Sequence, residues 1–597
     1  MVDTPTADSP AEPDITHVNP ATERTWFGHP RQLARLFSTE MWERFGYYGM
    51  RALLTLYLTQ HFMFGDRAAT GLYGGYTALV YLTPLVGGYL ADQFLGFKRA
   101  VKFGAILMSL GYFVLCFGGQ TAKPFATIEG QRYEVSIEKA EAGEQRFVMV
   151  DGHKQLIKGN DDGSVSLIEN GQTVRTVAKG GFESDATRSP LFVMILLIGL
   201  SMVSVGNGFF KPNISTMVGE LYAPDDRRRD SGFTIFYMGI NLGSLLSQAL
   251  CPFLADTVGW WAGFGLAAGG MLVSWALIQF AGPKLAGIGE PPAKPNVDRQ
   301  QWWIYLGALL FVPVFYLLYI NLMASAPPAE GSGFLGYIAS LSLMGKLLFG
   351  TFIFAVPGIL VWSFFAGDRR EFQMMLAAMV LITFNVVFWT LFEQAGSSLT
   401  LFADRNTDLS FFGLFTISAG QTQTFNALFI VLLAPLMSML WAGLARRGME
   451  PTIPVKFGIA LIGVGAGFLL LVWGSNWTDS SFKVSVWWLA GLYFIHSFAE
   501  LCISPVGLSM ITKLSIARIV GMMMGVWFLS ISVAQYFAGM IAQLASVETV
   551  GGQVTNLKVS LDTYLATFTT ISEWAIGLGV LLLLLSWPLK KWMHGVK

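Results

Sequence analysis

The chain has 597 residues, of which 53% are hydrophobic and 13% are charged, and its formal net charge is +0. Because soluble domains carry roughly a quarter charged residues, this composition predicts an integral membrane protein. The balanced charge gives no overall positive field and therefore argues against nucleic acid as a partner. The cysteines Cys116, Cys251 and Cys502 lie far apart in apolar runs, which predicts packing thiols rather than a metal site or a disulfide framework.

Residues 1–36 are polar and rich in Pro, Thr and Asp, and we expect them to form a cytoplasmic N-terminal segment. They contain no apolar core of the kind that a cleavable signal peptide needs. The first hydrophobic helix is therefore expected to act as its own membrane signal.

The first span opens with charged and aromatic residues on one helical face. They recur at i, i+3/i+4, i+7/i+8 and i+11: Glu40, Glu43, Arg44, Tyr47, Tyr48 and Arg51. Ionisable groups inside a bilayer cost several kcal/mol unless they are paired or face water, so this face is a candidate functional site. The alternative is a set of structural ion pairs between helices.

About 14 apolar runs are long enough to cross a hydrocarbon layer of about 30 Å. Their approximate bounds are 41–63, 71–92, 100–119, 190–218, 231–256, 259–281, 302–324, 334–365, 372–402, 423–445, 454–475, 484–511, 519–543 and 568–591. An even number of spans places both termini on one side. Basic residues gather in the loops and flanks of that side, which predicts a multi-pass protein of the cell inner (plasma) membrane with both termini in the cytoplasm. These residues are Arg24, Arg31, Arg35, Lys98, Arg99, Lys102, Arg227, Arg228, Arg229, Arg446, Arg447, Lys513, Arg518, Lys590, Lys591 and Lys597.

Residues 120–189 interrupt the pattern between the third and fourth spans. Short alternating runs such as 133–137 and 164–168 are separated by the turn pairs Asp-Gly and Asn-Gly. We expect a small β-rich domain on the periplasmic face. The alternative is a disordered polar loop, because a few strands without a large core are only marginally stable.

The remaining spans predict an all-α protein of two six-helix bundles with two extra helices between them. The first bundle is expected over 37–283, a Pro-rich cytoplasmic linker over 284–300, the additional helices over 301–366 and the second bundle over 367–597. Two similar halves that meet at a midplane site are a recurrent plan of secondary transporters.

The second span closes with Gly87–Arg99, which resembles the loop signature of the major facilitator superfamily. Glycines allow close helix approach, and Asp92 can pair with bases or a helix end in a contact that breaks during rocking. We therefore expect Asp92, Lys98 and Arg99 to have a gating role. The alternative is an ordinary cytoplasmic loop whose basic residues only follow the positive-inside rule.

The opening stretch resembles the E-x-x-E-R-F-x-Y-Y signature of the proton-coupled oligopeptide transporter (POT) family. Four further segments look like family signatures: Lys211–Asn213, Phe236–Gly243, Phe388–Gln394 and Glu500–Pro505. The resemblance covers nearly all of the membrane part and leaves out the β insertion. It implies the major facilitator fold and a proton-coupled symporter that imports di- and tripeptides by alternating access.

The resemblance also implies roles for single residues. Arg44 and Lys211 would bind the peptide carboxylate, and Glu500 would bind the amine. The remaining expected substrate contacts are the amides Asn241 and Asn426, together with Tyr47, Tyr48, Tyr81, Arg51, Trp389, Trp527 and Ser504. Arg51 could equally be a structural partner of an acid. The two tryptophans could instead pack helices together or lie in an interfacial belt.

Proton coupling needs a carboxylate whose pKa can cross the working pH. Glu40, Glu43 and Glu393 are the candidates. We expect Glu393 to pair with Lys211 across the halves, so that protonating Glu393 frees Lys211 for the peptide. His61 is expected to be a solvated interface residue or to pair with Asp404 or Asp408.

Other classes fit less well. The chain has no H-E-x-x-H and no Gly-x-Ser-x-Gly elbow, which argues against an enzyme, and its charges differ between the halves, which argues against a channel. A transporter of another small anion, such as nitrate, on the same scaffold is the alternative. No metal and no cofactor other than the coupling proton is expected, and the chain is expected to work as a monomer.

Overall fold

The computed structural model describes residues 25–140, 143–223, 226, 228–285, 287–293, 296–325, 333–478, 480–504 and 507–596. Several residues named above lie outside this described part: Arg24, Arg227, Pro505, Lys597 and, within the expected linker, 286 and 294–295.

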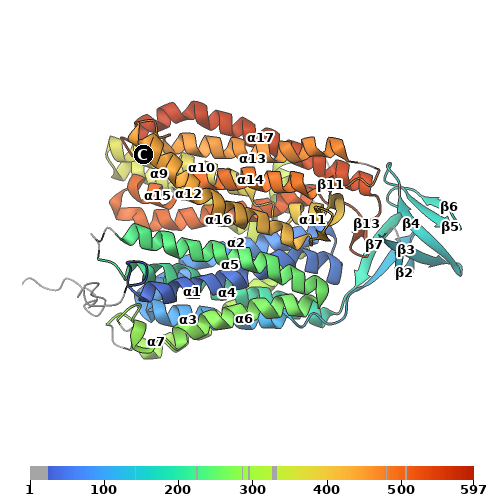
Figure 1. Ribbon diagram of the computed structural model, residues 1–597, viewed down its shortest axis with the longest axis horizontal. Helices are drawn as coiled ribbons and strands as arrows, with labels where there is room; N and C mark the ends of the chain where they lie inside the picture. Colours follow the sequence, from blue (N-terminus) through green and yellow to red (C-terminus); the bar gives the residue numbers. More distant parts are fainter. Residues whose placement is uncertain are drawn as a thin grey trace, which may run out of the picture.

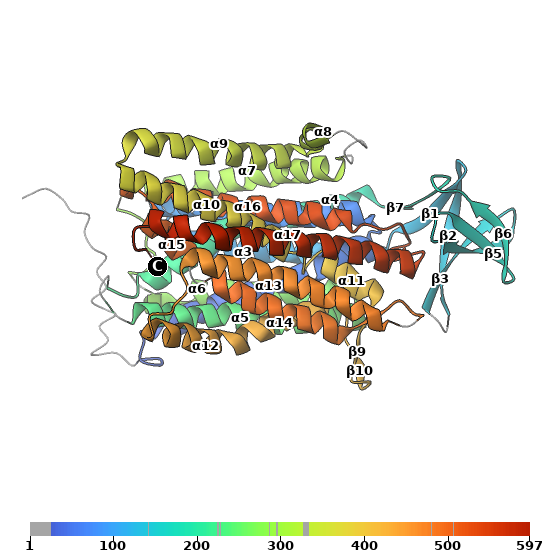
Figure 2. The same ribbon diagram turned by 90° about the horizontal axis from the view of Figure 1, so that it is seen from above.

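Long helices lie side by side and form one bundle (Figures 1 and 2). The N-terminal half comprises α1 (Gln32–Leu56), α2 (Asp66–Leu90), α3 (Phe97–Leu115), α4 (Pro190–Gly219), α5 (Arg229–Thr257) and α6 (Trp260–Gln279). The middle segment comprises α7 (Val297–Met323), α8 (Gly333–Ser340) and α9 (Leu343–Ala366). The C-terminal half comprises α10 (Arg369–Phe392), α11 (Ser398–Asn406), α12 (Thr424–Arg446), α13 (Ile453–Gly474), α14 (Val486–Ile503), α15 (Gly507–Leu514), α16 (Val520–Leu544) and α17 (Leu557–Trp592).

The helices agree with the predicted all-α membrane architecture. Within the described residues, 11 helical segments are long and apolar enough to cross a membrane, and all of them lie after residue 189. The more polar α1, α2 and α3 have 25, 25 and 19 residues and coincide with the first three predicted spans. Together they match the expected number of about 14 spans.

Three predicted spans each contain two helices. The run 334–365 divides into α8 and α9 because Ser342 caps α9, its side chain accepting a hydrogen bond from the Gly345 amide at 3.2 Å. The run 372–402 divides at a series of turns after Phe392, and the run 484–511 divides after Ile503. Hydrophobicity alone does not mark such breaks.

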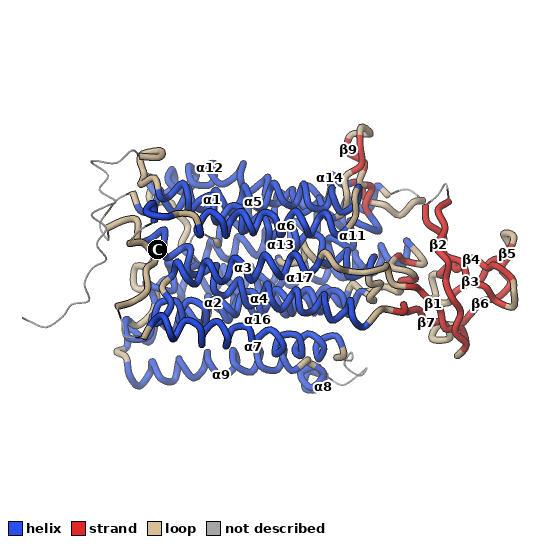
Figure 3. Tube along the Cα trace, turned by 90° about the horizontal axis from the view of Figure 1, so that it is seen from below, coloured by secondary structure: helices blue, strands red, loops and turns tan. Residues whose placement is uncertain are grey.

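The expected β insertion is present, and the alternative of a disordered loop is wrong. Its strands are β1 (Lys123–Ile128), β2 (Gln131–Ala140), β3 (Gly143–Val150), β4 (His153–Gly159), β5 (Val165–Glu169), β6 (Gln172–Val177) and β7 (Phe182–Thr187). They form one antiparallel sheet in the order β6-β5-β4-β3-β2-β1-β7. Positive φ angles at Asp151-Gly152 and Asn170-Gly171 fit the predicted tight turns. Figure 3 shows the sheet beyond one end of the helices, here called the sheet end of the bundle.

The sheet is encoded in the N-terminal half but also binds the connection between α16 and α17. This connection contains β12 (Thr549–Val550) and β13 (Gln553–Val554). Arg146 Nε donates to the Val550 carbonyl at 2.9 Å, and the Gly159 amide donates to the Thr555 carbonyl at 3.1 Å. Val550 is 1% exposed and belongs to the apolar cluster of the sheet together with Val148. The other half of the protein therefore completes the core of the sheet.

At its base the sheet is attached to the N-terminal half. Arg188, which follows β7, donates from Nε to the Phe62 carbonyl at 2.7 Å and from Nη2 to the Met63 carbonyl at 2.6 Å. The Ala122 amide, just before β1, donates to the His61 carbonyl at 2.9 Å. The sheet is thus bonded to both halves.

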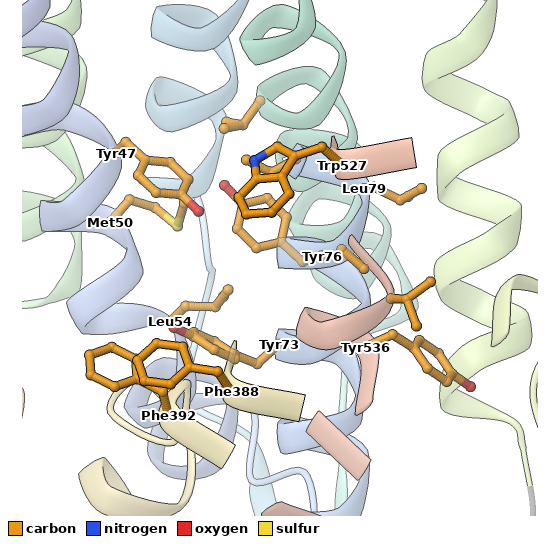
Figure 4. Close-up of a cluster of buried hydrophobic side chains, with 14 of the residues drawn as sticks. Tyr47, Met50, Leu54, Tyr73, Tyr76, Leu79, Phe388, Phe392, Trp527 and Tyr536 are labelled. Carbon is orange, nitrogen blue, oxygen red and sulfur yellow. The ribbon is translucent and has the colours of Figure 1, made fainter. Parts of the chain in front are cut away.

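The two halves share one hydrophobic core. α2 and α16 cross at Gly74 and Gly539, where a Cβ atom added to Gly74 would lie 2.6 Å from the Gly539 Cα. Only glycines allow backbones to approach this closely. Figure 4 shows the neighbouring aromatic cluster, to which α1 contributes Tyr47, α2 contributes Tyr76, and α16 contributes Trp527.

The middle helices contact both halves. α7 is fastened to the N-terminal half, because the hydroxyl groups of Ser204 on α4 and Tyr319 on α7 lie 2.8 Å apart. At the start of α9, the hydroxyl group of Ser342 lies 2.9 Å from that of Tyr536 on α16, in the C-terminal half. The helices α7 and α9 therefore connect the halves on the side where α2 meets α16.

Candidate functional site

A cavity of about 220 Å³ lies between the two halves. From the N-terminal half it is lined by Tyr48, Arg51, Tyr81, Lys211, Tyr237, Ile240, Asn241, Ser244 and Gln248. From the C-terminal half it is lined by Trp389, Phe392, Glu393, Ala395, Gln423, Asn426, Ala427, Tyr493, His496, Glu500 and Ser504. Ten of the predicted site residues are therefore brought together here.

The charged face of α1 forms a cluster with α4. The Lys211 Nζ atom lies 3.0 Å from Glu40 Oε1, which is also 3.4 Å from Arg44 Nε. Arg44 in turn donates one hydrogen bond to each carboxylate oxygen of Glu43. The two glutamate side chains are 0% exposed and that of Lys211 is 31% exposed, so Lys211 is the member of the cluster that reaches the cavity.

Arg44 was expected to face the peptide carboxylate, but it does not line the cavity in this conformation. Its guanidinium group is held by Glu43 and Glu40 and lies 5.0 Å from the centre of the Tyr47 ring. The side chain is only 5% exposed. In this conformation Arg44 is therefore engaged by carboxylates and is not free to meet a ligand.

The expected pairing of Glu393 with Lys211 is wrong in this conformation. Glu393 forms its ion pair with Arg51 of α1, which also donates to the Tyr73 hydroxyl, whereas Lys211 is paired with Glu40. Arg51 lies two helical turns beyond Arg44 on the same face of α1, and this places it at the level where α10 ends.

Glu500 stands on α14, on the wall opposite Lys211. Asn426 Nδ2 donates to Glu500 Oε2 at 3.3 Å and to Ser497 Oγ at 3.1 Å. No ion pair with Glu500 is present within the described part of the chain. A half-buried acid without a basic partner, facing a cavity, is well placed to attract a cation.

Asn241 lines the facing wall formed by α5, and its amide donates to the Tyr237 carbonyl of its own helix at 3.0 Å. Trp389 lines the cavity as well, and its indole donates to Asn385 Oδ1 at 3.1 Å. Tyr48 and Tyr81 add aromatic surface from α1 and α2.

Tyr47 and Trp527 were expected to line the substrate space, but both lie in the packed core (Figure 4). Tyr47 is 0% exposed, and Trp527 is 7% exposed and covers Gly507, where an added Cβ would meet the indole at 2.4 Å. Successive residues of a helix point about 100° apart, so Tyr48 can face the cavity while Tyr47 packs in the core.

Sequence reasoning missed a polar row on each wall. Tyr237, Ser244 and Gln248 lie four residues before and three and seven residues after Asn241 on α5. Tyr493 and His496 lie seven and four residues before Glu500 on α14. These residues could have been identified by counting three, four and seven positions along the helix from Asn241 and from Glu500, because such positions lie on the same helical face.

Two of the three predicted gating residues, Lys98 and Arg99, bind the linker. Lys98 pairs with Glu290, Arg99 Nη1 lies 2.7 Å from Asp298 Oδ1, and Asp92 accepts a hydrogen bond from Gln93 at 2.8 Å. The Lys98 amide also donates to the Gly289 carbonyl at 2.8 Å. The loop between α2 and α3 is thereby attached to the connection that leads into α7.

His61 fits neither expectation. It is 7% exposed, its Nε2 lies 3.0 Å from the Gly118 carbonyl oxygen, and its ring stacks on that of Tyr57. Asp404 instead accepts hydrogen bonds from Gln60 at 2.9 Å and from Gln553 at 3.1 Å.

Contacts between the halves close the cavity toward the sheet end. Asp66 on α2 and Arg405 on α11 form a bidentate ion pair with both distances at 2.6 Å and side chains at most 1% exposed. Thr55 donates to the Gly396 carbonyl at 2.5 Å. In contrast, Lys211, which lies toward the end of α4 away from the sheet and lines the cavity, has a side chain that is 31% exposed. The cavity is therefore more open at the end away from the sheet.

A larger hollow of about 570 Å³ lies between α8, α10, α16 and α17, but none of the described residues that line it is an acid or a base. In the part of the chain that the structure describes, no group of three or more His, Cys, Asp or Glu residues could hold a metal ion. The larger hollow therefore offers no charged side chain to a ligand, unlike the smaller cavity between the halves.

Comparison with known proteins gives matches over nearly the whole chain. The model of the POT family matches residues 98–557. The chain is 31% identical to the peptide transporter YePEPT of Yersinia enterocolitica, over 98% of this chain and 99% of the relative. It is also 31% identical to a di-/tripeptide transporter of Lactococcus lactis, over 96% and 99%.

Two solved structures share the fold. The crystal structure of the peptide transporter POT in complex with sulfate superimposes with a TM-score of 0.71 and 28% identity, covering 98% of this chain and 100% of that one. A crystal structure of tetrameric PepTSo2 gives a TM-score of 0.69 with 25% identity over 94% and 98%.

Proposed function

Because the chain belongs to the POT family, we propose that it imports di- and tripeptides together with protons by alternating access. Its relatives are transporters and not enzymes, and two of them are named as transporters of peptides. The fold supports the same function, since two helical halves enclose a polar cavity that is more open at one end.

The observation that carries the proposal is the placement of opposite charges on opposite walls. Lys211 reaches the cavity from the N-terminal half, and Glu500 reaches it from the C-terminal half. A peptide of any sequence has one carboxylate and one amine, so this arrangement can hold both termini while the remaining walls accept varied side chains. Asn426 beside Glu500 and Asn241 on the facing wall supply amide groups for the backbone.

Proton binding is coupled to peptide binding through exchange of ion-pair partners. Glu40 competes with a peptide carboxylate for Lys211, and its protonation releases the lysine to the substrate. Glu43 holds Arg44 in the same way and can release it as a second cation. The proton is the only coupling species that we propose.

A second proton site lies at the contact between the halves. Glu393 holds Arg51 across the interface, and protonation of Glu393 weakens this contact. Proton binding at Glu393 therefore favours separation of the halves at the sheet end.

A transporter of a small anion such as nitrate on the same scaffold is the alternative. Its cavity would need cations, which Lys211 and Arg51 provide, but it has no use for Glu500. An unpaired acid in the cavity repels an anion and attracts an amine. Glu500 therefore favours a peptide.

We propose that the protein lies in the inner (plasma) membrane. The sheet end then faces the outside of the cell, and both termini lie in the cytoplasm. The basic loop with Lys98 and Arg99 then lies on the cytoplasmic side, in agreement with the positive-inside pattern. We also propose that a single chain carries out transport, although one structural relative is described as a tetramer.

Uptake by proteoliposomes tests the function. Purified protein in vesicles with an inside-alkaline pH gradient should accumulate radiolabelled dialanine, and a protonophore should abolish the accumulation. Nitrate should neither be accumulated nor compete. Accumulation of nitrate without accumulation of dialanine would support the alternative.

A further inference from the structure

A short aromatic hairpin between α11 and α12 is not used by the transport site. It is formed by β9 (Ser410–Phe411) and β10 (Phe415–Thr416), which pair antiparallel. Figures 2 and 3 both show it projecting sideways from the helical bundle, close to the sheet end. The hairpin is therefore a separate feature of the lateral surface.

The tip of the hairpin is strongly apolar and exposed. Phe412 is 71% exposed, Leu414 is 81% exposed and Phe415 is 55% exposed. Phe412 also has a positive φ of 54°, beside Gly413 at 69°. A bulky residue rarely adopts this conformation, because it costs of the order of 1 kcal/mol or more. The strained backbone keeps a phenyl ring at a place where a turn would favour Asn or Gly.

The apolar tip continues into a band of aromatic rings. The ring centres of Phe412 and Trp487, at the start of α14, lie 4.5 Å apart. The next residue, Trp488, stacks on Trp477 at 5.3 Å, and Trp477 meets Trp473 at the end of α13 at 5.0 Å. Trp473 and Trp477 are 56% and 60% exposed. The rings of the band thus extend from the hairpin to the end of α13 and the start of α14, in two contacting groups that adjoin at Trp487 and Trp488.

The chemistry of the band identifies its partner. Exposed aromatic rings gather where membrane-spanning helices leave the hydrocarbon layer, because they bury an apolar body and leave polar atoms in water. A two-stranded hairpin has unpaired backbone groups at its edges, so it cannot enter the hydrocarbon and must remain at the headgroup level. A soluble protein partner would not need a surface that continues onto lipid-facing helices.

We propose that the hairpin 410–416 is an interfacial anchor that inserts Phe412, Leu414 and Phe415 among the lipid headgroups at the sheet end of the transporter. Its partner is the bilayer surface itself. The hairpin lies between α11, which carries Arg405, and α12, which carries Asn426. The anchor therefore fixes how deep in the bilayer the segment between Arg405, in the closing contact, and Asn426, in the cavity wall, is held.

Spin labelling tests the depth of the hairpin. A nitroxide is attached at Leu414→Cys in a variant whose three native cysteines are replaced, and the protein is placed in vesicles of phosphatidylethanolamine and phosphatidylglycerol. Power saturation then compares the accessibility of the label to oxygen, which enriches in lipid, and to a water-soluble nickel chelate. Gln172→Cys, exposed on the sheet, serves as the aqueous reference, and Leu432→Cys, 56% exposed on α12, serves as the hydrocarbon reference.

We expect the oxygen-to-nickel ratio at Leu414 to lie between those of the two references. A ratio equal to that of Gln172→Cys would show a hairpin in water and overturn the proposal. Low accessibility to both reagents would show that protein, such as a second copy of the chain, covers the tip, and would overturn it as well. In detergent-free amphipol no bilayer surface exists. There the ratio at Leu414→Cys should fall to that of Gln172→Cys, whose own ratio should stay the same.

Discussion

Arg51 on α1 and Glu393 at the end of α10 form an ion pair that joins the two halves of the transporter. Each side chain is only 7% exposed. Removing one partner of a buried pair leaves an uncompensated charge, which typically costs about 3–5 kcal/mol. The pair therefore stabilises closure at the sheet end only while Glu393 is ionised.

The variant Glu393→Gln keeps the size of the side chain but cannot take up or release a proton. We expect it to lose uphill uptake of dialanine and to retain exchange of labelled for unlabelled peptide across the membrane. Glu371→Gln is the matched control, because Glu371 lies in the first turn of the same helix and caps it. Accumulation of peptide against a gradient by Glu393→Gln would contradict the coupling role.

Glu40 competes with the substrate for Lys211, whose Nζ lies 3.0 Å from its carboxylate. In Glu40→Gln the lysine is free at every pH, so the affinity for dialanine at neutral pH should rise about tenfold, which corresponds to about 1.4 kcal/mol. Equilibrium binding to the purified protein measures this change. An affinity equal to or weaker than that of the wild type would refute the competition.

Lys211→Met should have the opposite effect, because a hydrogen bond to a charged group contributes about 1.5–3 kcal/mol. We expect the affinity for dialanine to fall at least tenfold in the same binding assay. Lys456→Met is the control, since Lys456 is paired with Glu450 at 2.6 Å and does not line the cavity. Equal losses in both variants would indicate a general structural effect.

Glu500 is expected to bind the peptide amine, and a substrate comparison isolates this contact. Glu500→Gln should bind dialanine at least tenfold more weakly than the wild type, while N-acetyl-dialanine, which has no charged amine, should bind both proteins within about a factor of two. Competition for labelled peptide uptake gives both affinities. The amine role fails if the two ligands respond equally to the substitution.

The sheet is bonded to both halves, so opening at the sheet end must separate it from one of them. Ser184 on β7 donates to the Thr549 carbonyl of β12, and Asp161 Oδ2 lies 2.5 Å from the Lys558 Nζ at the start of α17. Because the chain enters and leaves the sheet within the N-terminal half, the contacts with 549–558 are those that can break. The sheet should therefore favour the conformation closed at its end.

A disulfide tests this restraint. In a variant without native cysteines, Ser184→Cys combined with Thr549→Cys should lose at least nine tenths of its uphill uptake on oxidation and recover it on reduction. Thr127→Cys with Glu183→Cys links paired strands within the sheet and should leave uptake unchanged. Full transport by the oxidised first pair would mean that the sheet does not restrain the halves.

The sequence predicts the helices well and their mutual arrangement poorly. A run of about 20 apolar residues is a local property, so the spans could be located, whereas the capped break at Ser342 depends on one side-chain hydrogen bond. Lys211, Glu393 and Arg51 could be identified as costly charges, but their pairing depends on the relative depth of α1, α4 and α10.

The orientation of single side chains was also beyond the sequence. Tyr48 lines the cavity, whereas its neighbour Tyr47 and the distant Trp527 pack in the core, because the rotation of each helix is set by packing against its neighbours. The resemblance to a family supplied the residue types of the site. It did not show that Glu40 would hold Lys211 in this conformation.

Val550 gives the sheet a constraint on its biogenesis. The ribosome makes the seven strands long before it makes Val550, so the nascent sheet emerges on its side of the membrane with an incomplete core. Only after α16 has been inserted and the chain has returned to the same side can the core close. The sheet should therefore reach its final protease resistance late in synthesis, and completion of its core would report that α16 is correctly inserted.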